Sequence, residues 1–380
     1  MNALETASGG IMCAFAICGV LYCVIAVLLV ARFMAAVRPR TSALPSVTII
    51  KPLHGAPPGL LQSLESFCRQ DYGGVWQIVF GVQDPGDPAI PVVRELRRRN
   101  PTLDIAMVVN ARLHGVNRKT SNLINIAARA KHEILILSDA DIRVKPDYLH
   151  TVVAALSRKD VGVVSCLYVG EAGTSLWSKL SAMAINYQFL PSAVLGKSIG
   201  LAQPCFGSTI GIRAQVLREI GGFEALADHL ADDYEIGRAV RARGYKIAMP
   251  PIVVSHLCTE ATARELFDHE LRWGFTVRRI DFPGYIGSIV THPLPLAVIG
   301  GALLGFPPPV LWLAAAALLV RIALRLCIDS ATGARAGYWW LMPTRDMLSF
   351  IVFIASFTVS TVGWHGRRFR VDRDGVLSHT

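Results

Sequence analysis

The chain contains 380 residues, enough for one large domain or two smaller ones. Hydrophobic residues make up 52% of the sequence, and a mean hydropathy of +0.42 excludes an ordinary soluble enzyme. The formal net charge of +10 could suit nucleic acid, but many of the cations flank apolar segments, where they can contact anionic lipid. Composition therefore predicts a membrane protein without a nucleic-acid partner.

The first membrane segment is predicted near the N-terminus. The run from Ile11 to Val30 carries no charge, and twenty apolar residues can cross a bilayer as a helix. Glu5 precedes this run, whereas Arg32 and Arg38 follow it. The excess of cations on the following side predicts a transmembrane helix over residues 1–34, with the N-terminus outside and the rest of the chain entering the cytoplasm.

The other end of the chain, residues 281–364, is predicted to be a second membrane region. No charged residue occurs from Phe282 to Val320, and three prolines at 307–309 divide the run. This pattern predicts a helical hairpin over about 286–327. Arg321 and Arg325, near the end of its second helix, would bring the chain back to the cytoplasmic face.

A further apolar segment, residues 347–364, is long enough to span. A span would place the basic tail, residues 365–380, outside and against the charge rule. A re-entrant or interfacial segment would keep the tail inside. The length of the segment favours the span, and the charge rule keeps the other alternative open.

Between the membrane regions, residues 45–280 alternate between strand-like and helix-like patterns. The strand-like runs "SVTIIKP", "WQIVFGV" and "LDIAMVV" each precede or follow an amphipathic stretch. This alternation predicts an α/β domain with a mostly parallel sheet and helices on its faces. Ligands of such sheets lie beyond the carboxyl ends of the strands.

Carboxylates follow two of the predicted strands. Asp84 ends one of them, and Asp139 and Asp141 end the run "HEILILSDADIRV". A spacing of two would place this pair on one side of a strand, where the charges repel unless something positive lies between them. The pair suits a hard divalent cation, although Asp also favours plain polar turns. Neither a GxGxxG fingerprint nor a P-loop is present, which disfavours a dinucleotide enzyme or an ATPase.

Two later motifs complete a recognisable order. Asp232 and Asp233 precede a predicted helix, and "HELRW" contains Arg272 and Trp273. With Asp84 and the Asp-x-Asp pair, they resemble the D, D, D, (Q/R)xxRW pattern of glycosyltransferase family 21, the ceramide glucosyltransferase type. The similarity runs from about residue 45 to the tail, and throughout it extends to the bacterial branch that includes hopanoid-associated glycosyltransferases. His269 stands where that pattern has Gln or Arg.

The resemblance implies a GT-A type, Rossmann-like fold, a UDP-sugar donor, inversion at the sugar, and Mg²⁺ or Mn²⁺ between the paired carboxylates. Asp233 is implied as the general base, with Asp232 as the competing choice. The site residues so assigned are, for catalysis, Asp233, Arg272, Trp273 and His269; for donor binding, Asp84, Lys119, Asp139, Pro52 and His54; and for the metal, Asp139 and Asp141.

The implied activity is transfer of a sugar to a membrane lipid hydroxyl, with UDP-glucose and ceramide as the first pair. Transfer of N-acetylglucosamine to a hopanoid of the bacteriohopanetetrol type is the alternative. The alternative outside the enzymes is a lipid-binding protein without catalytic activity. The expected location is the inner membrane, crossed several times, with the catalytic domain facing the cytoplasm.

Overall fold

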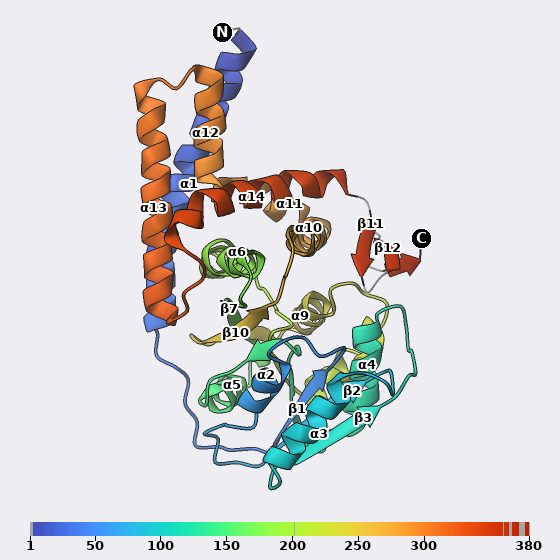
Figure 1. Cartoon of the computed structure of the whole chain (residues 1–380). Coiled ribbons are helices and arrows are strands. Elements are labelled where there is room, and N and C mark those ends of the chain that lie inside the picture. The colour runs from blue at the N-terminus through green and yellow to red at the C-terminus, as the bar shows by residue number, and fades with distance from the viewer. Residues whose placement is uncertain (1–2, 201, 360, 365–366, 372–376, 380) are drawn as a thin grey trace.

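The structure is a computed structural model that describes residues 3–200, 202–359, 361–364, 367–371 and 377–379. Figure 1 shows an α/β domain on which a bundle of helices stands. The bundle combines the first helix of the chain with two late ones: α1 (Ala3–Ala35), α12 (Pro293–Leu304) and α13 (Pro308–Thr332). The two ends of the sequence therefore meet in one helical unit.

The main sheet of the described chain has seven strands in the order β3-β2-β1-β4-β8-β6-β9. Their bounds are β1 (Val47–Pro52), β2 (Trp76–Val82), β3 (Asp104–Val109), β4 (Ile134–Leu137), β6 (Val161–Ser165), β8 (Ile210–Arg213) and β9 (Lys246–Ala248). Among these strands, β3, β2, β1 and β4 run parallel, as do β6 and β9. Strand β8 runs antiparallel to both of its neighbours. The predicted mostly parallel sheet is confirmed, with β8 as its exception.

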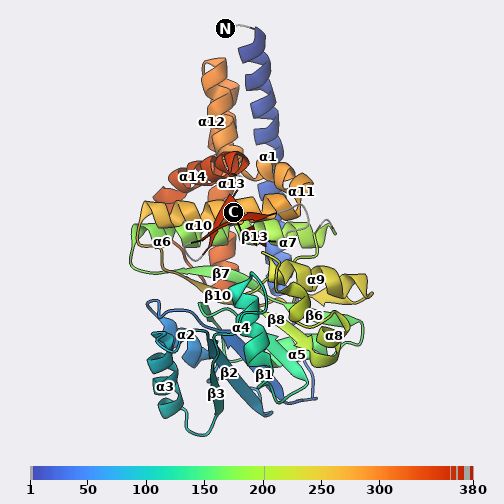
Figure 2. The same ribbon diagram turned by 90° about the vertical axis from the view of Figure 1, so that its right-hand side faces the viewer.

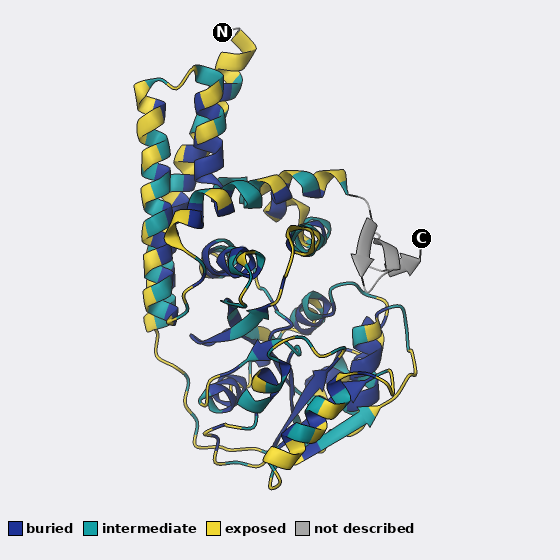
Figure 3. Cartoon of the chain, viewed as in Figure 1, coloured by how far each residue is buried: buried dark blue, intermediate teal, exposed yellow. Residues whose placement is uncertain are grey.

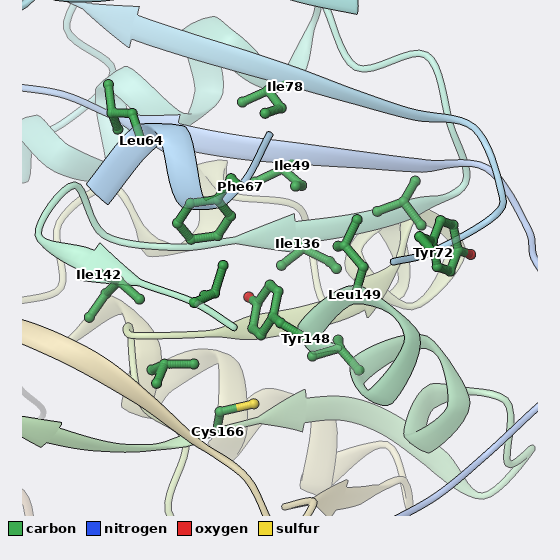
Figure 4. Packing of buried hydrophobic residues seen from close by; sticks show 14 of the residues in the cluster. Ile49, Leu64, Phe67, Tyr72, Ile78, Ile136, Ile142, Tyr148, Leu149 and Cys166 are labelled. Carbon is green, nitrogen blue, oxygen red and sulfur yellow. The ribbon is translucent and has the colours of Figure 1, made fainter. Parts of the chain in front are cut away.

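Alternate residues of each strand face opposite layers of helices. Ile49 packs with the layer of α2 (Leu60–Ser66), α3 (Ala89–Arg99) and α5 (Tyr148–Leu156), part of which Figure 4 shows. Ile50 faces the other layer, formed by α4 (Arg118–Ala127), α8 (Ala214–Glu219) and α9 (Asp232–Ala242). Because both faces are covered, the strands are mostly apolar, as expected for a buried parallel sheet.

A smaller sheet connects this domain to the helical bundle. It has the order β5-β10-β7, with β5 (Ile142–Arg143), β10 (Val253–Cys258) and β7 (Leu167–Ala172). Helix α6 (Leu176–Ala184), the π-helix η1 (Ile185–Phe189) and α7 (Leu190–Ser198) cover it. Tyr22 and Ala26 of α1 pack in the same apolar cluster as Val169 of β7 and Leu180 of α6. The C-terminal half of α1 is therefore part of the core of the domain.

The remaining elements are one short helix between α8 and α9 and the elements that follow β10. They are η2 (Glu224–Leu226), α10 (Ala263–Ile280), α11 (Phe282–Gly287), η3 (Ser288–Thr291), η4 (Trp339–Leu341), α14 (Met342–Ala355), η5 (Ser356–Thr358), β11 (Thr361–Trp364), β12 (Arg367–Val371) and β13 (Leu377–His379). The last three strands form a small antiparallel sheet. Parts of the predicted basic tail, residues 365–366, 372–376 and 380, lie outside the described residues.

Within the described residues, three helical segments are long and apolar enough to cross a membrane: Ala3–Ala35, Pro308–Thr332 and Trp339–Thr358. A bent pair, Phe282–Thr291 and Pro293–Leu304, would add a fourth if it acts as one span, but its halves meet at 71°. Large exposed apolar side chains on α1 and α13, among them Leu28 and Trp312, suit contact with lipid. The outer faces of these helices are largely exposed in Figure 3.

The predicted apolar segment 347–364 is not one continuous helix. Helix α14 ends at Ala355, and the residues from Thr361 to Trp364 form strand β11. Three of the five residues from 359 to 363 are β-branched and one is Gly, which favours an extended chain. Helix α14 also runs across α1 and α13 rather than along them (Figures 1 and 2). This orientation favours the interfacial alternative for α14 over a span.

Two buried ion pairs fasten the bundle to the domain. Arg321 of α13 makes a bidentate contact with Asp346 of α14 at 2.9 and 2.7 Å, and it also donates to the Tyr187 carbonyl of η1. Arg345 of α14 pairs with Glu270 of α10 at 2.7 Å through both nitrogens.

Arg321 and Arg325, which the charge pattern expects at the cytoplasmic face, have side chains that are buried inside the protein. Arg321 is 1% exposed, because Asp346 lies opposite it. Arg325 is buried as well, and it lies 3.5 Å from Asp329 one helical turn along.

We expect Arg321→Ala to lower the free energy of unfolding by about 3–5 kcal/mol, because Asp346 would stay buried without its partner. Thermal unfolding of the purified protein in detergent, followed by tryptophan fluorescence, measures the loss. Arg264→Ala is the matched control, since its pair with Asp268 is exposed and such pairs contribute about 1 kcal/mol at most. Equal melting temperatures for the two variants would contradict the assignment.

Candidate active site

A cavity of about 510 Å³ lies beyond the carboxyl ends of β1 and β4, beneath helix α10. Its lining includes all but one of the residues predicted for the site: Pro52, His54, Lys119, Asp139, Asp141, Asp233, His269, Arg272 and Trp273. They come from the loops after β1 and β4, from the first turns of α4 and α9, and from one face of α10. The fold therefore brings together segments that are up to about 220 residues apart.

Asp139 and Asp141 lie in a turn between β4 and β5 rather than on a continued strand. The buried Lys51 of β1 supports this turn from below, donating to the Asp139 carbonyl at 2.7 Å and to the Ser138 hydroxyl at 3.2 Å. Its ammonium also lies 3.7 Å from the centre of the Phe67 ring. Burial lowers the pKa of Lys51 to about 7. Lys51 thus fixes the backbone from which both carboxylates project.

Each carboxylate of the pair has its own cationic neighbour. Lys119, in the first turn of α4, lies 2.9 Å from Oδ1 of Asp139 and 3.2 Å from Oδ2 of Asp232. Burial alone would lower the pKa of Lys119, but Asp139, Asp232 and Asp233 raise it above its ordinary value. The ammonium is therefore charged, and it balances Asp139 of the acidic pair together with Asp232 of α9.

His256 of β10 is the neighbour of Asp141, with Nδ1 3.5 Å from Oδ2. Burial raises the pKa of Asp141, but His256 and Lys51 outweigh it and hold that pKa at about 2. The pKa of Asp139 is raised, chiefly by burial. Sequence reasoning did not single out His256; its signal is a polar residue near the carboxyl end of the β-branched run "IVVSHLC".

Asp232 and Asp233 open helix α9 and have different partners. Asp232 is buried and paired with Lys119, whereas Asp233 accepts from the backbone N–H of Gly207 at 2.9 Å and of Tyr234 at 2.8 Å. Burial and the charge of Asp232 raise the pKa of Asp233 to about 6. A carboxylate poised near neutral pH can take up a proton during a reaction, which is the property of a general base.

Helix α10 forms the opposite wall of the cavity. Arg272 is largely buried there, and burial lowers its pKa while Asp141 raises it. His269 donates to or accepts from Glu260 through Nδ1 at 2.6 Å, and its ring packs edge-on against Trp273 with 4.5 Å between ring centres. The cationic and aromatic side chains of "HELRW" thus face the acidic side of the site across the cavity.

A sequence profile of glycosyl transferase family 21 matches residues 11–377. The chain belongs to this family. Ceramide glucosyltransferase 1 of Caenorhabditis elegans is 23% identical over 351 residues, which cover 88% of this chain and 73% of that protein. Ceramide glucosyltransferase of Candida albicans is 33% identical over 122 residues, covering 29% of this chain and 22% of its own. The family 21 chain is a glycosyltransferase, as its sequence predicts.

A solved structure supports the predicted fold. Mannosyltransferase PcManGT from Pyrobaculum calidifontis, in complex with GDP-Man and Mn²⁺, aligns with a TM-score of 0.53 over 91% of this chain and 99% of its own. At 21% identity the likeness shows the fold alone. The GT-A type prediction for this family 21 protein is confirmed.

Asp84 is the predicted site residue that does not line the cavity. It is exposed in the loop after β2, where its Oδ1 accepts from the Gly86 N–H at 2.8 Å. Its neighbour Gln83 lines the cavity instead. The buried Asp87 holds the loop by accepting from the Gly55 N–H at 3.0 Å. The role of Asp84 in binding the donor base therefore stays a prediction.

The acidic pair of the family 21 site fits a divalent cation. Oδ1 of Asp141 is buried and has no hydrogen-bond partner in the described chain, so its lone pairs are available to a ligand. No group of three or more His, Cys, Asp or Glu side chains that could hold a metal occurs among the described residues. A cation held by two carboxylates would need further oxygen ligands from a phosphate-bearing substrate, which is the usual arrangement for Mg²⁺.

Gly207 permits the close approach of the turn before β8 to this cluster. A Cβ atom at Gly207 would lie 2.9 Å from Oδ2 of Asp139 and 3.2 Å from Nζ of Lys119. We expect Gly207→Ala to displace both side chains and to reduce transfer on the order of 10²-fold, the cost of a misplacement of about 1 Å. Initial rates of the two purified proteins measure it.

Gly287→Ala is the control for this variant, because a Cβ there meets nothing within 4 Å. Its rate should equal that of the parent protein. Full activity of Gly207→Ala would show that the cluster tolerates the displacement.

Proposed function

We propose that this protein is a membrane-bound inverting glycosyltransferase that transfers glucose from UDP-glucose to the hydroxyl of ceramide. The observation that carries the proposal is the cavity itself. It places the free oxygen of Asp141 and the cation Lys119 on the same side as Asp233, a carboxylate whose pKa is raised to about 6. The names of the relatives supply the sugar and the lipid.

The donor end of the site would hold the UDP-sugar and its metal. Asp139 and Asp141 would bind Mg²⁺ or Mn²⁺ together with the diphosphate; PcManGT was solved with Mn²⁺. The cation would act as a Lewis acid on the departing diphosphate. Arg272, across the cavity, offers paired N–H donors to the same phosphates. Pro52 and His54 line the end of the cavity where the nucleotide would lie.

The acceptor end of the site is next to the membrane helices. Helix α10 lines the cavity on one side, and on the other it is held by Arg345 of α14. Just beyond its end, Phe282 and Ile286 of α11 are exposed. These apolar side chains would lie in the lipid surface, so that a lipid hydroxyl has a short path to Asp233. The excess of cations after α1 supports a catalytic domain on the cytoplasmic side of the inner membrane, where a UDP-sugar would be available.

The test of this function is a transfer assay with the purified protein in lipid nanodiscs. We expect UDP-glucose and ceramide to give UDP and glucosylceramide, detected by mass spectrometry, and we expect EDTA to abolish the reaction. UDP-N-acetylglucosamine with a bacteriohopanetetrol-type hopanoid is the competing pair. Product from that pair alone would replace the ceramide proposal, and donor-independent lipid binding without UDP release would indicate a silent lipid-binding protein.

We expect Asp233→Asn to retain donor binding and to lose transfer by about 10² to 10⁴-fold, because the amide cannot accept the hydroxyl proton. Calorimetry with the UDP-sugar and the transfer rate of the same preparation separate the two effects.

In the parent protein, transfer should fall as pH drops below about 6, where Asp233 becomes protonated.

Asp232→Asn distinguishes the two acidic neighbours. Its main effect should be on donor binding, since Asp232 pairs with Lys119. If Asp233→Asn loses donor binding and transfer together, Asp233 belongs to the donor site and the base lies elsewhere.

A further inference from the structure

Glu260 is a buried carboxylate directly behind the catalytic helix α10. It lies between β10 and α10, its side chain is 8% exposed, and its Oε1 is 2.6 Å from Nδ1 of His269. A buried carboxylate without a partner is costly, so an acidic residue at this place must be compensated by its neighbours. Glu260 does not line the cavity, whereas His269 does.

The position of Glu260 is fixed by the elements around it. Ser175, the N-cap of α6, donates its hydroxyl to the Glu260 carbonyl. On the other side, Thr262 caps α10 by accepting from the Glu265 N–H at 3.2 Å, and Glu265 in turn accepts from the Ala261 N–H at 2.8 Å. These two bonds resemble a capping box, with Glu265 reaching the residue before the N-cap, and they fix the start of the helix. The carboxylate of Glu260 is therefore presented to α10 from a rigid loop.

The charge of Glu260 determines which ring nitrogen of His269 is protonated. Burial raises the pKa of Glu260, but the hydrogen bond with His269 and the other neighbours outweigh it, so that pKa is lowered. An ionised carboxylate accepts and does not donate, so Nδ1 of His269 carries a proton. Nε2 is then the ring nitrogen of His269 that can contact a ligand in the cavity. The same ring packs at 67° against Trp273, so its orientation also bears on that side chain.

We propose that Glu260 is a positioning residue for sugar transfer, which holds His269 in one tautomer and one orientation beside Arg272 and Trp273. This inference rests on the proposed function only in requiring that the site transfer a sugar; the identity of the sugar and of the lipid does not enter it. A glutamine at 269 would carry its own amide N–H donors and would not need the carboxylate. Glu260 and His269 should therefore act as a unit.

A double-mutant cycle tests the proposal with Glu260→Gln, His269→Gln and the double variant. We expect Glu260→Gln alone to reduce kcat/KM for the donor by about tenfold to hundredfold, the range found when the carboxylate behind a metal-bound histidine is removed. In the His269→Gln background the same change should cost less than about twofold. The readout is UDP release from whichever nucleotide sugar and lipid the parent protein uses, so failure of the ceramide proposal changes the substrates and not the cycle.

The control is Glu265→Gln, which changes a glutamate at the start of the same helix but retains a capping side chain; its rate should match that of the parent. If Glu260→Gln has no effect, or costs the same in both backgrounds, Glu260 only supports the fold and the proposal is overturned. If Glu260→Gln does not fold, Glu260→Asp replaces it in the cycle. That variant withdraws the carboxylate by one methylene, and it should again reduce transfer only when His269 is present.

Discussion

Lys119 is the charge on which the acidic side of the active site depends. Its ammonium contacts Asp139 and Asp232 together, and Asp233 also raises its pKa. Without this cation, buried carboxylates from the β4 turn and from α9 would repel one another across a few ångströms. Because Gly207 has no side chain, its turn can lie close to Asp139 and Lys119. The β4 turn, the start of α9 and this turn can meet in one place because the single ammonium of Lys119 balances the charges of the carboxylates.

Helix α10 connects the helical bundle to the wall of the cavity. Arg272 and Trp273 of this helix line the cavity, while Glu270 on the same helix forms a bidentate ion pair with Arg345 of α14. Arg321 then joins α14 to α13 and to η1. A continuous set of buried polar contacts therefore runs from the apolar bundle to the cavity wall. The catalytic domain is built onto the membrane helices rather than attached to them by a linker.

Local patterns in the sequence predict much of this arrangement. Strand ends and the family motif place nine of the ten assigned residues in one cavity, because parallel strands end at one edge. Partners chosen by tertiary packing escape such patterns. Arg321 looks like a headgroup anchor until Asp346 is seen opposite it, and the acidic pair occupies a turn where alternation predicts a strand. His256, Asp87 and Glu260 have no motif because their roles exist only through contacts with distant segments.

The packing of α1 constrains how the protein can be made. Gly9 and Gly19 allow α1 to approach its late partners closely: a Cβ at Gly19 would lie 2.5 Å from the Val290 carbonyl oxygen, and one at Gly9 would lie 2.6 Å from Leu304. Helix α12 begins at Pro293, about 260 residues after α1 ends, which is a delay of roughly 13 to 50 s during synthesis. Through that interval lipid must cover the glycine face of α1 while the α/β domain folds beside it. Helices α12 and α13 would then have to displace that lipid when they pack against α1.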